Sequence, residues 1–401
     1  MKFINEANVV GKRVLVRADF NVSLDEEGKV IDDFRIRATL PTIQYLIENS
    51  AKVILMSHLG KPLENQRFIP SGAEGVNSKN QKEKFSLSPI AKRLSELSGA
   101  QVFFVADCVG SEVERRVSEL KPGEVLLLEN LRFHKEEELN DEAFAQNLAR
   151  LAEIYVNDAF GTCHRSHASV VAVTKFLPSY AGLLLQKEVE NLSRARDNPD
   201  HPLTVVIGGA KMSTKIKLIQ SFFDKAENII LGGALANTVL HAKGIAVGKS
   251  IIEESMVPEI QKFEITSTKV HLPLDALLCT DKDDLATCHP GPIGLMQPED
   301  SILDIGLDTE KLFARVMEFS KMVVWNGPMG LFEIDAFAHG SKAIARAIAL
   351  SGAYSIVGGG ETVAFLEKAG LIDSFSFVST GGGAMMEFLA GDKLPGLTAL
   401  E

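Results

Sequence analysis

The sequence contains little tryptophan, tyrosine and cysteine. Among 401 residues there are one tryptophan, four tyrosines and four cysteines. The cysteines include no C-x-x-C pair and form no dense framework, which is typical of proteins in a reducing cytosol. We therefore expect buried free thiols at all four positions, which are Cys108, Cys163, Cys279 and Cys288.

Long apolar runs and a basic excess are also missing. No stretch approaches the length of a membrane span, and the first residues, MKFINEANVVGKR, lack the apolar core of a signal peptide. The net charge of −11 argues against a nucleic-acid or anionic-membrane partner. The sequence predicts a cytoplasmic protein in which any anion site must be a local basic cluster.

Two common nucleotide-binding motifs are absent. No strand-like run is followed by G-x-G-x-x-G with an acidic residue about twenty positions further on, which disfavours an NAD dehydrogenase. The stretch GIAVGKS at 244–250 is one residue short of a P-loop and follows a helix-like segment, so we discount it.

The pattern that dominates the chain is a short Val/Ile/Leu-rich run, a polar or glycine-rich break and an amphipathic stretch of helical period. This alternation predicts an α/β protein with parallel sheets, and the length favours two domains. We expect a first domain at 1–180, a connecting helix at 181–200 and a second domain at 201–384. Residues 64–84 have no periodic pattern and are expected to form a surface loop without a catalytic role.

The two halves differ in the residues that follow their strand-like runs, where open α/β sheets bind ligands. Second-half runs end in glycines, which suit a flat or phosphorylated ligand that approaches the backbone closely. First-half runs end in polar and charged groups, which suit a small anionic ligand; these are Asp19, Asn21, His58, Lys61, Arg132, His134, Asp158, His164, Arg165 and His167.

Two lysines follow the first glycine pair of the second half, in GGAKMSTKI. Lys211 and Lys215 are four residues apart, so we expect them on one face of a helix, with one near a transferred group and the other near nucleotide phosphates. The alternative is a solvated helix face. A basic site and a glycine-rich nucleotide site together favour phosphoryl transfer, which depends on positioning and on neutralising charge.

The segment CHRSHAS at 163–169 could be mistaken for a metal cluster. An arginine between two histidines would repel a cation, so anion binding is the better interpretation. His164 could be purely structural, and Asp158 could serve only to orient Arg165.

The chain resembles the phosphoglycerate kinase family over nearly its whole length. The matching motifs, in family order, are VRADFNV, DDFRIRATLPTI, SHLGKP, LLLENLRFHKEE, NDAFGTCHRSHAS, GGAKMSTKI, VVWNGPMGLFE, VGGGETV and VSTGGGAMMEFL. The resemblance implies reversible transfer of the acyl phosphate of 1,3-bisphosphoglycerate to MgADP, giving ATP and 3-phosphoglycerate. It also implies a monomer of two Rossmann-like domains that closes about a hinge, with a tail at 385–401 that packs on the first domain.

The resemblance also implies roles for individual residues. Arg35 would reach the reacting carboxylate, and Arg37 would make only a surface ion pair. The substrate-binding positions would be Asp19, Phe20, Asn21, Arg35, His58, Leu59, Gly60, Lys61, Arg132 and Arg165. The catalytic positions would be Arg35, Lys211, Lys215, Gly382 and Gly383. The nucleotide-binding positions would be Lys215, Gly232, Gly233, Asn326, Leu331, Glu333, Gly358, Gly359, Gly360, Glu361 and Thr362, with Glu361 also a ligand of Mg²⁺.

Four positions depart from the family's pattern. Glu361 stands where the family generally has aspartate, and Lys61 where many members have arginine. Ala234 replaces the third residue of a glycine triplet, and Ile302 stands where glycine commonly lines the adenine slot. Both replacements add bulk to the adenine slot, and the added methylene of Glu361 changes how its carboxylate is held.

Two other functions remain open at this level. A kinase for a different small carboxylic acid would leave His58, Arg132 and Arg165 without a distal phosphate to bind. The other is a hinge-closing binding protein for an anionic metabolite. The glycine-rich second half and the absence of a signal peptide both argue against it.

Overall fold

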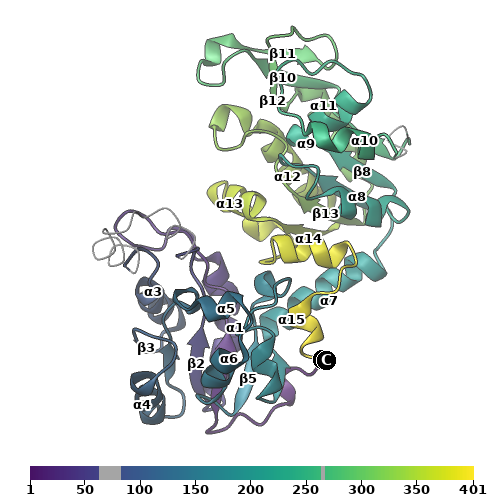
Figure 1. The fold of residues 1–401 in the computed structure, drawn as a ribbon. Coiled ribbons are helices and arrows are strands. Elements are labelled where there is room, and N and C mark those ends of the chain that lie inside the picture. Colours follow the sequence, from purple (N-terminus) through teal and green to yellow (C-terminus); the bar gives the residue numbers. More distant parts are fainter. Residues whose placement is uncertain (63–82, 263–266) are drawn as a thin grey trace. The chain divides into compact units, whose positions relative to one another are not determined.

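The computed structural model describes residues 1–62, 83–262 and 267–401, and the chain divides into two compact units (Figure 1). The first unit comprises Met1–Val189 together with Lys393–Glu401, and the second comprises Glu190–Asp392. The loop predicted at 64–84 lies outside the described residues, apart from two helical residues at its end. The assignment of one ligand to each predicted domain stays a prediction.

The first unit contains a parallel sheet of six strands in the order β3-β4-β2-β1-β5-β6. The strands are β1 (Arg13–Arg17), β2 (Lys52–Met56), β3 (Val102–Phe104), β4 (Val125–Leu127), β5 (Ile154–Asn157) and β6 (Ser179–Ala181). Strands β1, β2, β4 and β5 consist largely of apolar residues and are buried in the middle of the sheet, as expected for parallel strands that are covered on both faces.

Helices of the first unit connect these strands, and their apolar faces cover the sheet. The α-helices that lie wholly in this unit are α1 (Phe34–Glu48), α3 (Ser88–Ser98), α4 (Ser111–Glu119), α5 (Lys135–Glu138), α6 (Glu142–Ala149) and α15 (Pro395–Thr398). Helix α7 (Leu183–Asp197) begins in the first unit and ends in the second. Short 3-10 turns are η1 (Ile4–Glu6), η3 (Leu131–Phe133), η4 (Phe160–Thr162) and η5 (Ala172–Lys175). Helix α3 illustrates the local rules, because a proline lies in its first turn and Gly99, with φ of 68°, follows its last residue Ser98.

The second unit repeats the design with the strand order β15-β14-β13-β7-β8-β9, again parallel. The strands are β7 (Leu203–Ile207), β8 (Asn228–Leu231), β9 (Val270–His271), β13 (Met322–Asn326), β14 (Tyr354–Gly358) and β15 (Phe377–Val378). The fully buried Trp325 lies on the central strand β13 and packs in the core of this unit. The predicted α/β class with two parallel sheets is therefore confirmed.

The helices of the second unit follow its strands in the same alternation. They are α8 (Ile216–Phe223), α9 (Gly233–Ala242), α10 (Val257–Ile260), α11 (Leu307–Met317), α12 (His339–Ser351), α13 (Gly360–Lys368) and α14 (Gly383–Leu389). The 3-10 turns are η6 (Glu254–Met256), η7 (Leu285–Thr287), η8 (Asp335–Phe337) and η9 (Ile372–Ser374).

A small antiparallel sheet in the second unit was not expected from the sequence. Its strands β10 (Asp275–Cys279), β11 (Cys288–Pro292) and β12 (Ser301–Ile305) have the order β11-β10-β12. The alternation along the chain predicted parallel sheets, and this prediction is wrong for the apolar run DALLCT at 275–280. The connection from β10 to β11 is too short for the crossover that a parallel pair requires, so the chain returns as a hairpin.

The expectation of four free thiols is also wrong. Cys279 and Cys288 are directly opposite each other in the β10–β11 register and form a disulfide, whereas Cys108 and Cys163 are buried free thiols. The pairing was invisible in the sequence because the hairpin was not recognised, and only the hairpin places residues nine apart side by side.

This connectivity predicts the number of thiols that can be alkylated. Denatured protein that has never met a reductant should incorporate two iodoacetamide groups, at Cys108 and Cys163. The same protein after reduction should incorporate four, counted by intact-mass spectrometry. Four groups without reduction would contradict the disulfide.

Candidate active site

The carboxyl edge of the first sheet holds a basic cluster built around an arginine that has no access to water. Arg17 ends β1 and is fully buried. Its Nε donates to Ser169 Oγ at 2.8 Å, and this hydroxyl donates to Glu137 Oε1 at 2.6 Å. Its Nη1 donates to the carbonyl of Ala18. The buried positive charge is therefore balanced through a chain of hydrogen bonds rather than by solvent.

Glu137 is the counter-charge of this network, and it is itself completely buried. Burial raises the pKa of Glu137, while the charge of Arg17 and the hydrogen bonds from Ser169 oppose that rise. Sequence inspection missed both Arg17 and Glu137. The available signal was an arginine inside the otherwise apolar strand RVLVR.

His58 and His167 lie within the electrostatic reach of the same arginines. Burial, followed by the charges of Arg17 and Arg132, lowers the pKa of His58 well below its ordinary value. Burial, Arg17 and Arg132 also lower the pKa of His167 to about 3. Arg17 Nη2 lies 3.2 Å from His58 Nδ1, which fits donation by arginine to a neutral ring. Both histidines therefore contribute hydrogen-bonding groups without adding charge.

Arg132 is nearly buried in the turn η3 after β4. Its Nη1 donates to the carbonyl of Gly60 at 2.7 Å, which ties it to the loop after β2. Its Nε lies 3.0 Å from Glu138 Oε1, close enough for an ion pair, but the N–H is not aligned for a hydrogen bond within the described residues. Burial lowers the pKa of Arg132, and the charge of Arg165 lowers it further.

Arg35 and Asp19 form the less buried part of the cluster. Arg35 Nε lies 3.8 Å from Asp19 Oδ2, and its Nη1 donates to the carbonyl of Asn21. Asn21 Oδ1 in turn accepts from the Gly60 backbone at 2.8 Å, which joins the loops after β1 and β2. The sequence-predicted Asp19, Asn21, Arg35 and Gly60 are thus adjacent in space.

Other predicted substrate residues occupy different positions. Phe20 and Leu59 are buried in the hydrophobic core, so only their backbone atoms could face a ligand. Lys61 is exposed at the end of the same loop. Arg165 is half-buried, and the hydrogen bond that its side chain makes among the described residues joins its Nε to His164 Nε2 at 3.2 Å.

Asp158 has a role that differs from the expected one. It lies after β5, and its Oδ1 accepts from the backbone N–H groups of Leu184 and Leu185, at the start of α7. Burial raises its pKa to about 6. The carboxylate therefore caps α7, and the hypothesis that it orients Arg165 is not supported by any contact among the described residues. Arg37 does pair with Asp33 on the surface at 2.8 Å, which confirms that prediction.

Among the described residues, one group of three side chains could offer ligand atoms to a metal ion. Asp107, Cys108 and His134 bring these atoms within 4.8 Å of one another. His134 Nε2 already lies 2.8 Å from Asp107 Oδ1, and burial raises the pKa of the Cys108 thiol well above its usual range. Since a metal needs the thiolate, the chemistry of this group opposes metal binding.

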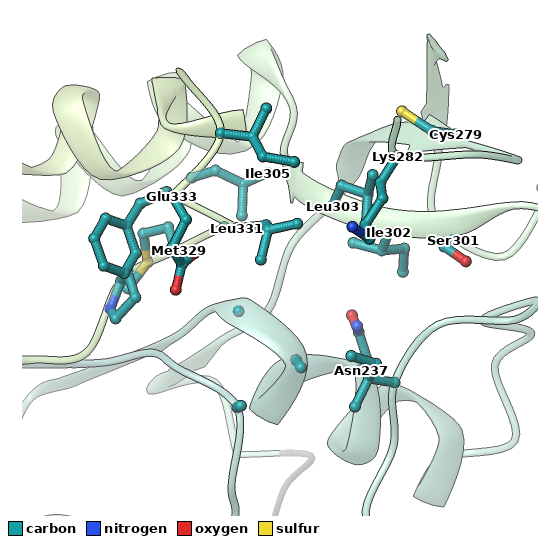
Figure 2. A pocket seen from close by; sticks show the side chains of 18 of the residues that line it. Asn237, Cys279, Lys282, Ser301, Ile302, Leu303, Ile305, Met329, Leu331 and Glu333 are labelled. Carbon is teal, nitrogen blue, oxygen red and sulfur yellow. The ribbon is translucent and has the colours of Figure 1, made fainter. Parts of the chain in front are cut away.

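The second unit contains a pocket of about 620 Å³ among α9, β10, β12 and the loop after β13 (Figure 2). Its predicted members are Gly233, Leu331, Glu333 and Glu361, and the departures Ala234 and Ile302 also line it. The walls are largely apolar, whereas exposed Glu361 lies at the end where α13 begins. Such a pocket fits a flat ring together with a charged tail.

Lys215 is buried beside this pocket, and its position corrects the expected arrangement. Helix α8 begins at Ile216, so Lys211 and Lys215 precede the helix and do not share a helical face. Lys215 Nζ turns back and donates to the carbonyl of Gly208 at 2.6 Å. Burial lowers the pKa of Lys215 to about 8, and the charge of Glu361 opposes that shift.

The glycine pair before the lysines allows this arrangement. Gly209 has φ of +90°, and a Cβ at Gly209 would lie 3.0 Å from Lys215 Nζ and 3.8 Å from Glu361 Oε2. Lys211 by contrast is exposed, and its ammonium has no hydrogen-bond or ion-pair partner in the part of the chain that the structure describes. One lysine is therefore held inside the site, and the other is available to a ligand.

The remaining predicted nucleotide residues form the edge of the second sheet. Asn326 Nδ2 donates to the carbonyl of Gly358 at 2.9 Å, and Thr362 Oγ1 accepts from the Gly327 backbone at 2.8 Å, so both side chains support the loops. Gly359 precedes α13, which begins at Gly360, and Gly382 precedes α14, which begins at Gly383. Gly232 precedes α9 and packs on Met329.

Comparisons with known proteins agree over the whole chain. The family model for phosphoglycerate kinase matches residues 4–392. A phosphoglycerate kinase of Moorella thermoacetica is 48% identical over 99% of this chain and 98% of its own length. A cytosolic phosphoglycerate kinase of Triticum aestivum is 47% identical over 99% and 97%. The solved phosphoglycerate kinase of Coxiella burnetii is 39% identical, with a TM-score of 0.82 over 99% of this chain and 98% of that one.

No helix among the described residues is both long enough and apolar enough to span a membrane.

Removal of the buried charge at Lys215 should stabilise the fold. We expect Lys215→Met to raise the free energy of unfolding at pH 7 by about 1–3 kcal/mol, because a desolvated ammonium is replaced by an apolar chain. The folded-state pKa of about 8 is below the unfolded value of 10.5. Above pH 8 the unfolded wild type binds the extra proton, so wild-type stability rises with pH and the advantage of Lys215→Met shrinks.

Urea unfolding of both proteins at pH 7 and pH 9.5 measures this difference. A Lys215→Met protein that is less stable than wild type at pH 7 would show that the hydrogen bonds of the ammonium outweigh its desolvation.

Proposed function

The chain belongs to the phosphoglycerate kinase family, and we propose that it transfers the acyl phosphate of 1,3-bisphosphoglycerate to MgADP in glycolysis, giving ATP and 3-phosphoglycerate. It is a phosphotransferase whose acceptor in the reverse direction is a carboxylate. The observation that carries the proposal is the basic cluster of the first unit, where four arginines and two uncharged histidines gather around three carboxylates in a partly desolvated setting.

The cluster suits a small ligand with a phosphate at one end and a carboxylate at the other. Arg132 and Arg165 present guanidinium groups that can bind phosphate oxygens through two hydrogen bonds, and neutral His58 adds a further polar group. Arg35, beside Asp19 and Asn21, would meet the carboxylate or acyl phosphate and neutralise charge during transfer. A substrate without a distal phosphate would leave Arg132 and Arg165 unused.

The pocket of the second unit suits the nucleotide. Leu331 and the glycines at the start of α9 would border the adenine, and exposed Glu333 would bind the ribose. Lys215 would bind the phosphates, and Lys211 would bind the group in transit. Backbone amides of the 358–360 and 382–383 segments, at the starts of α13 and α14, would add further hydrogen bonds to the phosphates. Protonated Lys215 would gain stability when a polyphosphate approaches, because an anion favours its charged form.

Glu361 fits a magnesium ion that bridges to nucleotide phosphates. Mg²⁺ in such sites uses one or two protein carboxylates and takes its other ligands from phosphates and water. Glu361 is exposed at the pocket's charged end, and Gly209 leaves the space between it and Lys215 unobstructed. The ion would supply further neutralisation of phosphate charge.

The reaction needs no general base in the direction of ATP consumption. The attacking carboxylate of 3-phosphoglycerate is ionised at neutral pH, so positioning and charge neutralisation carry the catalysis. The two substrates would bind to different units, and closure about α7 during turnover would exclude water from the reacting groups. We further propose that the protein is cytoplasmic, which the cytosolic description of the Triticum aestivum relative supports. We also propose that it acts as a monomer.

A coupled assay tests the reaction. Purified protein with MgATP and 3-phosphoglycerate should yield 1,3-bisphosphoglycerate, followed through NADH consumption by glyceraldehyde-3-phosphate dehydrogenase, while glycerate and acetate should give no turnover. Turnover with glycerate or acetate would favour a kinase for another carboxylic acid. Nucleotide binding without any turnover would favour a binding protein.

Exposed Lys211 should act mainly on the transferring group. We expect Lys211→Ala to lower kcat by about two orders of magnitude or more with little change in nucleotide affinity, because its charge is needed mainly in the transition state. Steady-state kinetics and calorimetric binding of ADP measure the two effects, and Lys217→Ala on the exposed face of α8 is the control. An unchanged kcat would remove Lys211 from the mechanism.

Arg35 should likewise be required for turnover but not for folding. Arg35→Ala is expected to reduce kcat about a hundredfold or more while the urea midpoint changes little, since the side chain is only partly buried and its ion pair with Asp19 is long. Arg37→Ala, two residues on and paired on the surface, should leave kcat unchanged. Normal turnover by Arg35→Ala would make Arg35 structural.

A further inference from the structure

The pocket of the second unit is lined by the amide of a buried residue, and this amide has no hydrogen-bond partner among the described residues. Asn237 lies on α9, one turn after Gly233, and lines the pocket with only 2% of its surface exposed. Its side chain makes no hydrogen bond to any residue that the structure describes. Figure 2 shows the amide directed from α9 across the pocket toward Ile302 and Lys282.

Thr238, the next residue on α9, differs from Asn237 because its side chain has hydrogen-bond partners within the protein. Thr238 is fully buried, yet its Oγ1 donates to the carbonyl of Ala234 at 3.3 Å and accepts from the Glu253 backbone at 3.1 Å. Asn237 is buried as a residue, but its amide atoms are not among the enclosed side-chain atoms that lack a partner, so they open onto the pocket. Water or a ligand in the pocket can therefore satisfy them. The amide of Asn237 is therefore directed at an occupant of the pocket.

The surroundings of Asn237 define the chemistry of that occupant. Ile302, Leu303 and Leu331 present apolar side chains to the same cavity, which suits the two faces of a flat heterocycle. An amide offers one acceptor and one donor in a single plane. This combination matches the edge of a ring that carries an amino group beside an unprotonated ring nitrogen.

Other polar groups at this end of the pocket are less able to discriminate between ligands. Lys249 and Lys282 are both exposed, and Lys282 Nζ lies 3.2 Å from Asp283 Oδ1. Exposed groups can exchange a ligand contact for water at little cost, but an amide that a bound ligand covers cannot.

We propose that Asn237 reads the nucleotide base, with Oδ1 accepting from the exocyclic amino group of adenine and Nδ2 donating to the adjacent ring nitrogen. The inference rests on the proposed function, because it takes the pocket as the nucleotide site. It makes Asn237 a specificity-determining residue that the resemblance to the family did not supply. A nucleotide without the amino group leaves Oδ1 buried and unsatisfied, which penalises binding.

Calorimetry without 3-phosphoglycerate tests the inference on wild-type protein and on Asn237→Leu. The ligands are ATP and purine riboside 5′-triphosphate, in which hydrogen replaces the amino group. Wild type should bind ATP about tenfold more tightly than the analogue. Asn237→Leu should bring the ratio close to one by weakening the binding of ATP more than that of the analogue.

Thr238→Val is the matched control, since it removes a buried polar group on the same helix that bonds within the protein. It should lower the urea midpoint and leave the ratio between ATP and the analogue unchanged. Asn237→Ser is a second variant in case leucine prevents folding, and it should also reduce the ratio.

The outcomes separate the two proposals. A wild type that binds ATP and the analogue equally, or an Asn237→Leu protein that keeps the full discrimination, would overturn the role of Asn237 while the kinase proposal stands. No binding of ATP to wild type would overturn both. Discrimination in binding without turnover on 3-phosphoglycerate would support Asn237 and contradict the kinase proposal.

Discussion

The candidate site depends on cations that the fold removes from water. Arg17 in the first unit is balanced through Ser169 by Glu137, and Lys215 in the second is held by the carbonyl of Gly208. A desolvated cation is costly by itself, so each requires fixed partners that cannot move away. Gly208 directly follows β7, whereas Glu137 lies in α5 after β4 and Ser169 in the segment after β5, so the order of strands and connections determines where positive charge can be concentrated.

The desolvation of these cations costs stability, but it also prepares the site for an anionic ligand. An anion that enters the first unit meets arginines and neutral histidines already in place, so little reorganisation is needed when charge shifts during transfer. A polyphosphate beside Lys215 favours the charged form that burial disfavours. In the proposed nucleotide site, the apolar pocket near the amide of Asn237 would hold the neutral part of the same ligand through complementarity of shape and hydrogen bonds.

Much of the fold and several site residues could be predicted because they depend on short stretches of chain. The apolar runs around Arg13–Arg17 and Met322–Asn326 are buried strands, and polar residues after them gather at one sheet edge. Arg17 and Glu137 were missed because their importance comes from burial, which residue type does not reveal. The Cys279–Cys288 disulfide was missed because it depends on a hairpin. Lys211 and Lys215 were wrongly placed on one helix face, because α8 begins only at Ile216, after both lysines.

The sequence by itself determined the α/β alternation, the contrast between a polar half and a glycine-rich half, and the motifs that identify the family, since periodicity and local spacing carry all three. Only the tertiary structure decided which of those groups lose contact with water. It buried Lys215 and exposed Lys211, turned Asp158 to the start of α7, and left the amide of Asn237 facing a pocket. The physical reason is that desolvation is a property of the packed neighbourhood, and residues distant in sequence supply that neighbourhood.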